Sequence, residues 1–132
     1  MKIAIAIIII SIFTAYATKQ GPLWRGTYLN EKAVKAKWGQ APLDYSKFKL
    51  GDLAIRSKMA ASILRDQTLI GKSADSIRQV LGDPDGFFYI DAYPAYLIQE
   101  GHSKSEETWQ LVFLLDSKFK VKEIKVHKNC CD

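Results

Sequence analysis

Residues 69–89 read LIGKSADSIRQVLGDPDGFFY, and in this stretch a helical pattern changes into a strand pattern. Ser73 is placed to cap the free amides of a helix, and Asp75 stands in the first turn, where the helix dipole favours negative charge. An apolar patch with helical spacing follows, made of Ile77, Val80 and Leu81. Gly82 suits a left-handed helix end, and Pro84 cannot continue a helix. The stretch therefore predicts a short amphipathic helix that ends at Gly82.

A longer helix is expected just before this one. Asp52 is placed as its N-cap, and the pattern continues to about Thr68. Apolar residues recur every four positions at Ile55, Met59 and Ile63, whereas Arg56 falls off this apolar stripe. We therefore expect a helix with one face against the core and Arg56 on another face.

After the turn at residues 83–86 the pattern becomes that of strands. Candidate strands are residues 87–90, 96–99, 109–115 and 121–127, and the third shows the clearest alternation, with Trp109, Leu111, Phe113 and Leu115 on one face. The expected fold class is α+β, with two helices packed on one face of a small antiparallel meander sheet.

Several of these pieces together resemble the SmpA/BamE family of outer-membrane assembly factors. They are the small residue Gly71, the capped start at Ser73, Ile77 within the helix, the LGDP run of residues 81–84 and the later hairpin of Trp109–Asp116 and Val121–Val126. The resemblance implies the two-helix, curved-sheet fold of those lipoproteins, which the β-lactamase-inhibitor-like proteins share. It also implies work in outer-membrane assembly or maintenance.

The first 17 residues read as a secretory signal peptide. Lys2 precedes an apolar run from Ile3 to Phe13, and Ala15-Tyr16-Ala17 offers small residues before a cleavage point. An uncleaved anchor is the alternative, but it needs about 20 apolar residues to cross a bilayer. We expect cleavage after Ala17 and a periplasmic or secreted protein. No cysteine lies near the cleavage point, so a lipoprotein is not expected.

The positive charge is concentrated in one segment of the 132-residue chain, whose formal net charge is +5. Residues 18–50 hold seven basic and two acidic residues, a net of +5, whereas residues 51–132 hold eleven basic and twelve acidic residues, a net of −1. The expected organisation is a signal peptide, a basic aromatic arm over 18–50, the α+β domain over 51–128 and a tail over 129–132.

The arm suggests two kinds of contact. One short helix is expected across residues 30–38, and it carries the interaction candidates Lys32, Lys35 and Lys37. Aromatic residues among lysines suit single-stranded nucleic acid, but an exported chain without a nucleic-acid motif makes an anionic membrane surface the better partner. Alternatively, the aromatic side chains pack on the domain while the lysines stay in water.

The chain offers no clear catalytic chemistry. His102 and His127 lack a neighbouring motif that would orient them, and the acidic cluster of Asp83, Asp85 and Asp91 lacks the closing Glu of a calcium loop. We therefore expect no catalytic residues, no cofactor, no metal and no enzyme. Cys130 and Cys131 form a possible disulfide, either with each other or with another chain, unless they are incidental thiols.

A cluster of aromatic residues between 87 and 96 predicts an interaction surface. Phe87 and Tyr89 are expected to face the helices, which leaves Phe88, Tyr93 and Tyr96 as outward contacts. The leading hypothesis is an exported, non-catalytic envelope protein that binds another protein or an anionic membrane surface. The alternative is an inhibitor or immunity-type protein that acts on a periplasmic or secreted enzyme. A hydrolase is the third hypothesis.

Overall fold

The computed structural model describes residues 27–102 and 107–128. The expected signal peptide and the cysteine pair at 130–131 lie outside these residues. In chain order, the elements are β1 (Thr27–Leu29), α2 (Glu31–Trp38), α3 (Tyr45–Lys49), α4 (Leu53–Arg65), the 3₁₀ turn η1 (Gln67–Leu69), α5 (Ala74–Leu81), β2 (Ala95–Gln99), β3 (Trp109–Leu115) and β4 (Val121–Lys128).

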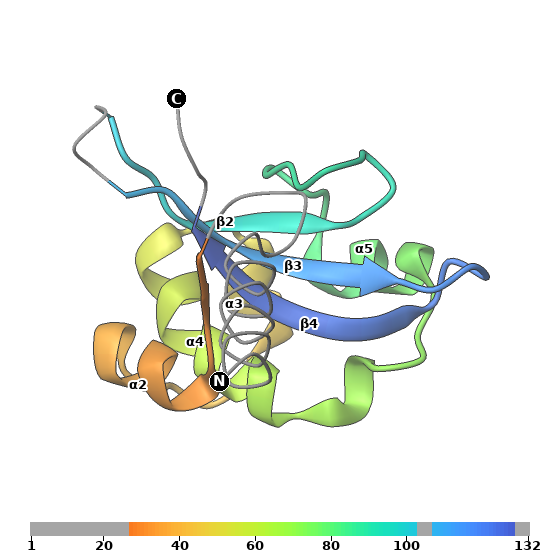
Figure 1. The fold of residues 1–132 in the computed structure, drawn as a ribbon. Coiled ribbons are helices and arrows are strands. Elements are labelled where there is room, and N and C mark those ends of the chain that lie inside the picture. Colours follow the sequence, from red (N-terminus) through yellow and green to blue (C-terminus); the bar gives the residue numbers. More distant parts are fainter. Residues whose placement is uncertain (1–26, 103–106, 129–132) are drawn as a thin grey trace, which may run out of the picture.

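The sheet has four antiparallel strands in the order β1-β4-β3-β2, and the helices gather on one side of it (Figure 1). Strands β2, β3 and β4 form the expected meander. The α+β fold class, with helices on one face of a small antiparallel sheet, is therefore confirmed. The strand expected at residues 87–90 is wrong, because this segment forms a loop. The fourth strand is instead β1, which pairs with β4 and was not expected.

Polar caps fix the helix boundaries. Asn30 Oδ1 accepts a hydrogen bond from the backbone N–H of Ala33 at 2.9 Å, and the Asp52 and Ser73 side chains cap α4 and α5 in the same way. All three caps are confirmed. Asp44 caps the short helix α3, which was not expected. Gly82 ends α5 with φ at +89°, a conformation that suits glycine.

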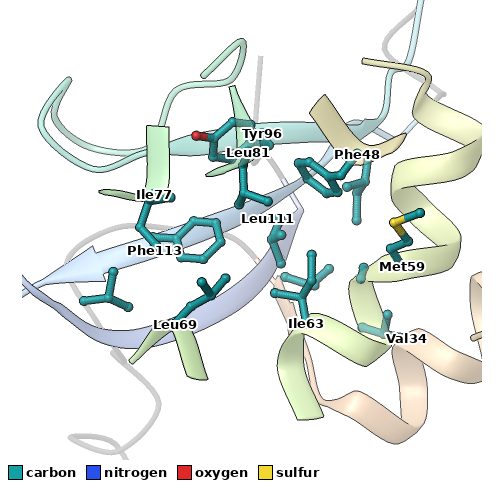
Figure 2. Packing of buried hydrophobic residues seen from close by; sticks show 14 of the residues in the cluster. Val34, Phe48, Met59, Ile63, Leu69, Ile77, Leu81, Tyr96, Leu111 and Phe113 are labelled. Carbon is teal, nitrogen blue, oxygen red and sulfur yellow. The ribbon is translucent and has the colours of Figure 1, made fainter. Parts of the chain in front are cut away.

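The main core lies between the helices and the sheet. Figure 2 shows Phe48 of α3 and Ile63 of α4 pointing toward the side of the sheet that carries Leu111 of β3. Tyr96 of β2 is also fully buried here, and its hydroxyl donates to the carbonyl oxygen of Gly82 at 2.8 Å. Burial raises the pKa of this phenol. The bond fastens the end of α5 to the sheet.

Residues 27–50, expected as part of an arm ahead of the domain, are built into it. Val34 of α2 and Phe48 of α3 are fully buried in the main core. The Trp38 indole N–H donates to Gln99 Oε1 at 3.0 Å, and its ring packs edge-on against Trp109. Each of these short elements supplies only one or two core side chains, so the segment shows no long apolar period.

Phe48 and Leu50 offer a test of this integration. Phe48→Ala is expected to lower the free energy of unfolding by about 3–5 kcal/mol, because it removes a buried ring and leaves a cavity. Leu50→Ala, at the end of the same helix but 82% exposed, is expected to change it by less than about 0.5 kcal/mol. Urea unfolding measures both, and Phe48→Leu gives an intermediate loss if Phe48→Ala fails to fold. Equal effects of the two alanine variants would contradict the buried placement.

The β3–β4 turn makes a pH-dependent contribution. Asp116 Oδ1 accepts the backbone N–H groups of Lys118 and Lys120 at 2.8 and 3.1 Å, and these bonds lower the pKa of its carboxyl. A lowered folded-state pKa stabilises the fold above the unfolded-state value, and this stability is lost as the pH falls through the folded value.

We therefore expect Asp116→Asn to flatten the dependence of unfolding free energy on pH below about pH 4. Asparagine keeps the acceptor oxygen while it removes the titrating charge. Denaturant unfolding between pH 2 and 6 measures the slope, with Asp91→Asn as the control for losing one exposed carboxylate. A slope for Asp116→Asn equal to that of the unchanged protein would refute this contribution.

Candidate functional site

The sheet face opposite the helices is partly covered by the loop that joins α5 to β2. We call residues 83–94 the aromatic loop. Phe88 of this loop is buried against Val112 of β3 and Ala95 of β2, and Tyr28 and Leu114 pack against the same small cluster. The loop thus has its own apolar contact with the sheet, separate from the main core.

A buried glutamine side chain holds the backbone of the aromatic loop. Gln110 Oε1 accepts the N–H of Phe87 at 3.1 Å, and Gln110 Nε2 donates to the carbonyl oxygen of Phe87 at 2.7 Å. The adjacent Gly86 leaves no space for a larger residue, since a Cβ there would lie 2.6 Å from Gln110 Oε1 and 3.1 Å from the Ala95 carbonyl oxygen. The Gln110 amide therefore binds the loop as a neighbouring strand would.

A second anchor fixes the start of the loop to the outer edge of β2. The Arg56 guanidinium is buried, and its Nη1 lies 2.8 Å from Asp85 Oδ2. Asp85 Oδ1 accepts the N–H of Leu97 at 2.9 Å, while Arg56 Nη1 donates to the Leu97 carbonyl oxygen at 3.3 Å. The N–H of Gly86 donates to the Ala95 carbonyl oxygen at 2.9 Å. These contacts satisfy the carbonyl oxygen of Ala95 and both the N–H and the carbonyl oxygen of Leu97 at the edge of β2.

The burial of Arg56 corrects the expectation that it lies away from the core. Its Nε also donates to the Phe48 carbonyl oxygen at 3.1 Å, and its guanidinium lies 4.9 Å from the centre of the Phe48 ring. A position off the apolar stripe of α4 thus faces α3 and the loop rather than water. Its partners are distant in sequence, so helix periodicity alone does not reveal them.

Because the loop is fixed in this way, it presents apolar side chains to solvent. Phe87 is 58% exposed, Tyr89 60% and Ile90 41%. Phe88, between the first two, points inward and packs edge-on against the His127 ring at 4.8 Å between centroids. Tyr89 has a left-handed backbone, with φ at +63°. Alternation about the buried Phe88 therefore directs Phe87 and Tyr89 away from the sheet.

The predicted orientation of the aromatic residues is consequently wrong at several positions. Phe88 and Tyr96, expected as outward contacts, are buried, and Tyr93 is half-buried. Phe87 and Tyr89, expected to face the helices, are exposed. The sequence did reveal the aromatic cluster. Which of its side chains point inward is decided by the packing of Phe88 on the sheet face opposite the helices. Gly86 and Pro94, which bracket the segment, were the available signal for a loop.

The three candidate lysines of α2 differ in their contacts. Lys37 Nζ lies 3.3 Å from Glu107 Oε2 and 5.3 and 5.6 Å from the ring centres of Trp38 and Trp109. The hydrogen bond from the Trp109 indole and then the bond from Lys37 hold the pKa of Glu107 below its usual range. Lys32 and Lys35 are exposed, and neither joins an ion pair within residues 27–102 and 107–128.

The ionisable groups of the described residues do not gather into a candidate metal site. Within the described part of the chain, no three His, Cys, Asp or Glu side chains gather closely enough to hold a metal ion. His102 is exposed in the β2–β3 connection, whereas His127 is buried in β4 beside Gln110. Among the helices described, none combines the length and apolar character needed to span a bilayer. The most distinctive surface is therefore the aromatic loop.

Comparison with known proteins gives no family assignment, since no family model, curated protein or solved structure matches the chain significantly.

Gln110→Leu tests how the aromatic loop is held. The variant removes both bonds to the Phe87 backbone, so we expect faster amide exchange at Phe87 and a loss of about 1–3 kcal/mol in unfolding free energy. Hydrogen exchange followed by NMR measures the first effect and urea unfolding the second. Gln79→Leu, on the exposed side of α5, is the matched control. Unchanged exchange at Phe87 in Gln110→Leu would show that other contacts hold the loop.

Proposed function

We propose that this protein is an exported, non-catalytic envelope protein that binds another protein through the aromatic loop. The observation that carries the proposal is the exposure of Phe87, Tyr89 and Ile90 on a loop whose backbone is anchored at Asp85, Gly86 and Phe87. About half of the surface of these three side chains stays in water in the monomer. A partner that covers them removes this surface from water.

The anchoring of the loop favours specific binding. Ordering a flexible loop on association opposes binding, whereas a loop already held by its own protein avoids most of that loss. Aromatic side chains are also the residues that contribute most often to binding energy at protein interfaces. The aromatic loop combines both properties, so it suits an apolar recess on a folded partner.

The charges beside the loop bear on the kind of partner. Asp83 and Asp91 are exposed within the aromatic loop, and Asp85 is partly exposed next to them. Carboxylates are repelled by an anionic bilayer and attracted by lysine and arginine side chains. We therefore propose a protein partner with an apolar recess bordered by basic residues. An anionic membrane surface would have to be met elsewhere, at Lys32 and Lys35 of α2.

The cellular setting is proposed from the sequence. The signal peptide over residues 1–17 supports export, and the LGDP run of residues 81–84 supports a relation to the SmpA/BamE family. The order of α4, α5 and the β3–β4 hairpin is in keeping with the two-helix fold and later hairpin on which this resemblance rests. On this basis the partner is an envelope protein, and the activity belongs to outer-membrane assembly or maintenance.

A second candidate function is inhibition of a periplasmic or secreted enzyme. It is favoured by the same anchored loop, since a rigid loop with apolar side chains at its surface can fill an enzyme cleft without being ordered first. The two functions differ in one measurement. An inhibitor abolishes the activity of its partner at one-to-one stoichiometry, whereas an assembly partner leaves catalytic rates unchanged.

Phe87→Asn combined with Tyr89→Asn tests the loop as a binding surface. We expect at least tenfold weaker binding to the partner, because two exposed aromatic contacts are lost while asparagine tolerates the left-handed backbone at position 89. The partner is first identified by photo-crosslinking from position 87 in producing cells, and affinity is then measured by calorimetry with the purified pair.

Phe119→Asn is the matched control. Phe119 is 61% exposed and also left-handed, with φ at +60°, but it lies in the β3–β4 turn. Loss of binding in the control, or crosslinks from position 87 to lipid alone, would refute a protein-binding loop. Mass spectrometry of the recovered chain tests export separately, since cleavage after Ala17 leaves Thr18 as the first residue.

A further inference from the structure

A mostly apolar groove of about 510 Å³ lies in the helical layer, between α3, α4 and the segment that joins α2 to α3. Buried Met59 and half-buried Ile55, both of α4, line it together with Leu43. Leu50, at the end of α3, also lines it and is 82% exposed. The volume is within the range of small-molecule sites, which is about 300–1,000 Å³.

Hydrogen bonds hold one wall of the groove in place. The N–H of Ala41 donates to the Lys58 carbonyl oxygen at 2.7 Å, and the Ser62 hydroxyl donates to the Ala41 carbonyl oxygen at 2.6 Å. Pro42, the next residue, has a restricted backbone. Both backbone groups of Ala41 are thus hydrogen-bonded to α4, which holds this wall of the groove in place without a ligand.

Two cationic side chains lie in the lining of this apolar surface. Lys47 of α3 and Lys58 of α4 line the groove, and neither joins an ion pair among residues 27–102 and 107–128. The one acidic lining residue, Asp44, uses Oδ1 to cap α3. A second hollow of about 380 Å³ shares Ala41 and Pro42 as its wall and is lined by two further cationic residues, Lys35 and Arg65.

We propose that the groove binds one molecule of a fatty acid with a chain of about twelve carbons. The alkyl chain lies against Met59 and Ile55 and covers Leu50, while the carboxylate meets the ammonium groups of Lys47 and Lys58. An apolar recess with cationic sides complements a ligand that has one alkyl chain and one negative charge. A binding helix would require a row of apolar pockets, and insertion into a bilayer would require protruding apolar side chains. Here Met59 and Ile55 are recessed, and Leu50 alone projects.

The test is calorimetric titration of the protein, purified in its processed form, with dodecanoate below its micelle concentration. Dodecyl maltoside and dodecyltrimethylammonium have an alkyl chain of nearly the same length with a neutral and a positive head group. We expect one saturable site for dodecanoate, with weaker binding of the neutral compound and the weakest binding of the cationic one. Shifts of the Met59 and Ile55 methyl signals in NMR spectra locate the ligand.

Two variants separate the charge contribution from the apolar one. Lys47→Glu combined with Lys58→Glu is expected to weaken dodecanoate binding about five- to tenfold and to reduce the preference for the negative head group. Lys32→Glu combined with Lys122→Glu makes the same change in net charge at exposed lysines outside the groove lining and is expected to leave binding unchanged. Leu50→Asn is expected to weaken all three ligands while the head-group order remains.

Three outcomes would overturn the proposal. One is the absence of saturable dodecanoate binding. Another is equal binding of the three head groups with no effect of the groove variants, which would indicate adsorption at many places. The third is occupation of the groove by an acidic amphipathic helical peptide or by anionic vesicles while dodecanoate does not bind. The groove variants leave the aromatic loop intact, so this result and the test of the protein-binding loop are independent.

Discussion

The hydrogen bonds of the buried Arg56 guanidinium fix how the helices, the sheet and the aromatic loop are arranged. The guanidinium extends from α4 and contacts the end of α3 through the Phe48 carbonyl oxygen, the edge of β2 through the Leu97 carbonyl oxygen, and the aromatic loop through Asp85. Taking a charge out of water is unfavourable unless its hydrogen bonds are satisfied. Because Arg56 finds its partners on three separate elements, it stabilises only the arrangement in which all three are in place.

The local parts of the fold could be predicted because their causes are local. A capped helix start at Asn30, Asp52 or Ser73 depends on a side chain and an amide three residues away. Strand β3 is buried on both faces, and its run of apolar residues identifies it from its own sequence. Helix α3 and strand β1 were missed because each is a few residues long and gains its stability from tertiary contacts rather than from a repeated pattern.

The aromatic loop shows the opposite case. Its residue types favour a strand, and alternation about Phe88 was correctly expected, but the direction of that alternation was reversed. The direction depends on Gln110, which lies 23 residues away in sequence and takes the place of a pairing strand for Phe87. A polar residue near the start of an otherwise apolar strand was the sequence signal, although its partner is visible only in three dimensions.

The contacts of the aromatic loop and Arg56 with the edge of β2 also affect the tendency of the protein to aggregate. An uncovered edge strand invites addition of strands from other molecules and so promotes aggregation. Here Asp85, Gly86 and Arg56 occupy three backbone groups of one sheet edge, at Ala95 and Leu97, and the other edge is β1, only three residues long. The contacts that hold the loop therefore also oppose the addition of a strand at this edge, so loss of the Arg56–Asp85 pair would expose the Leu97 backbone groups as well as release the loop.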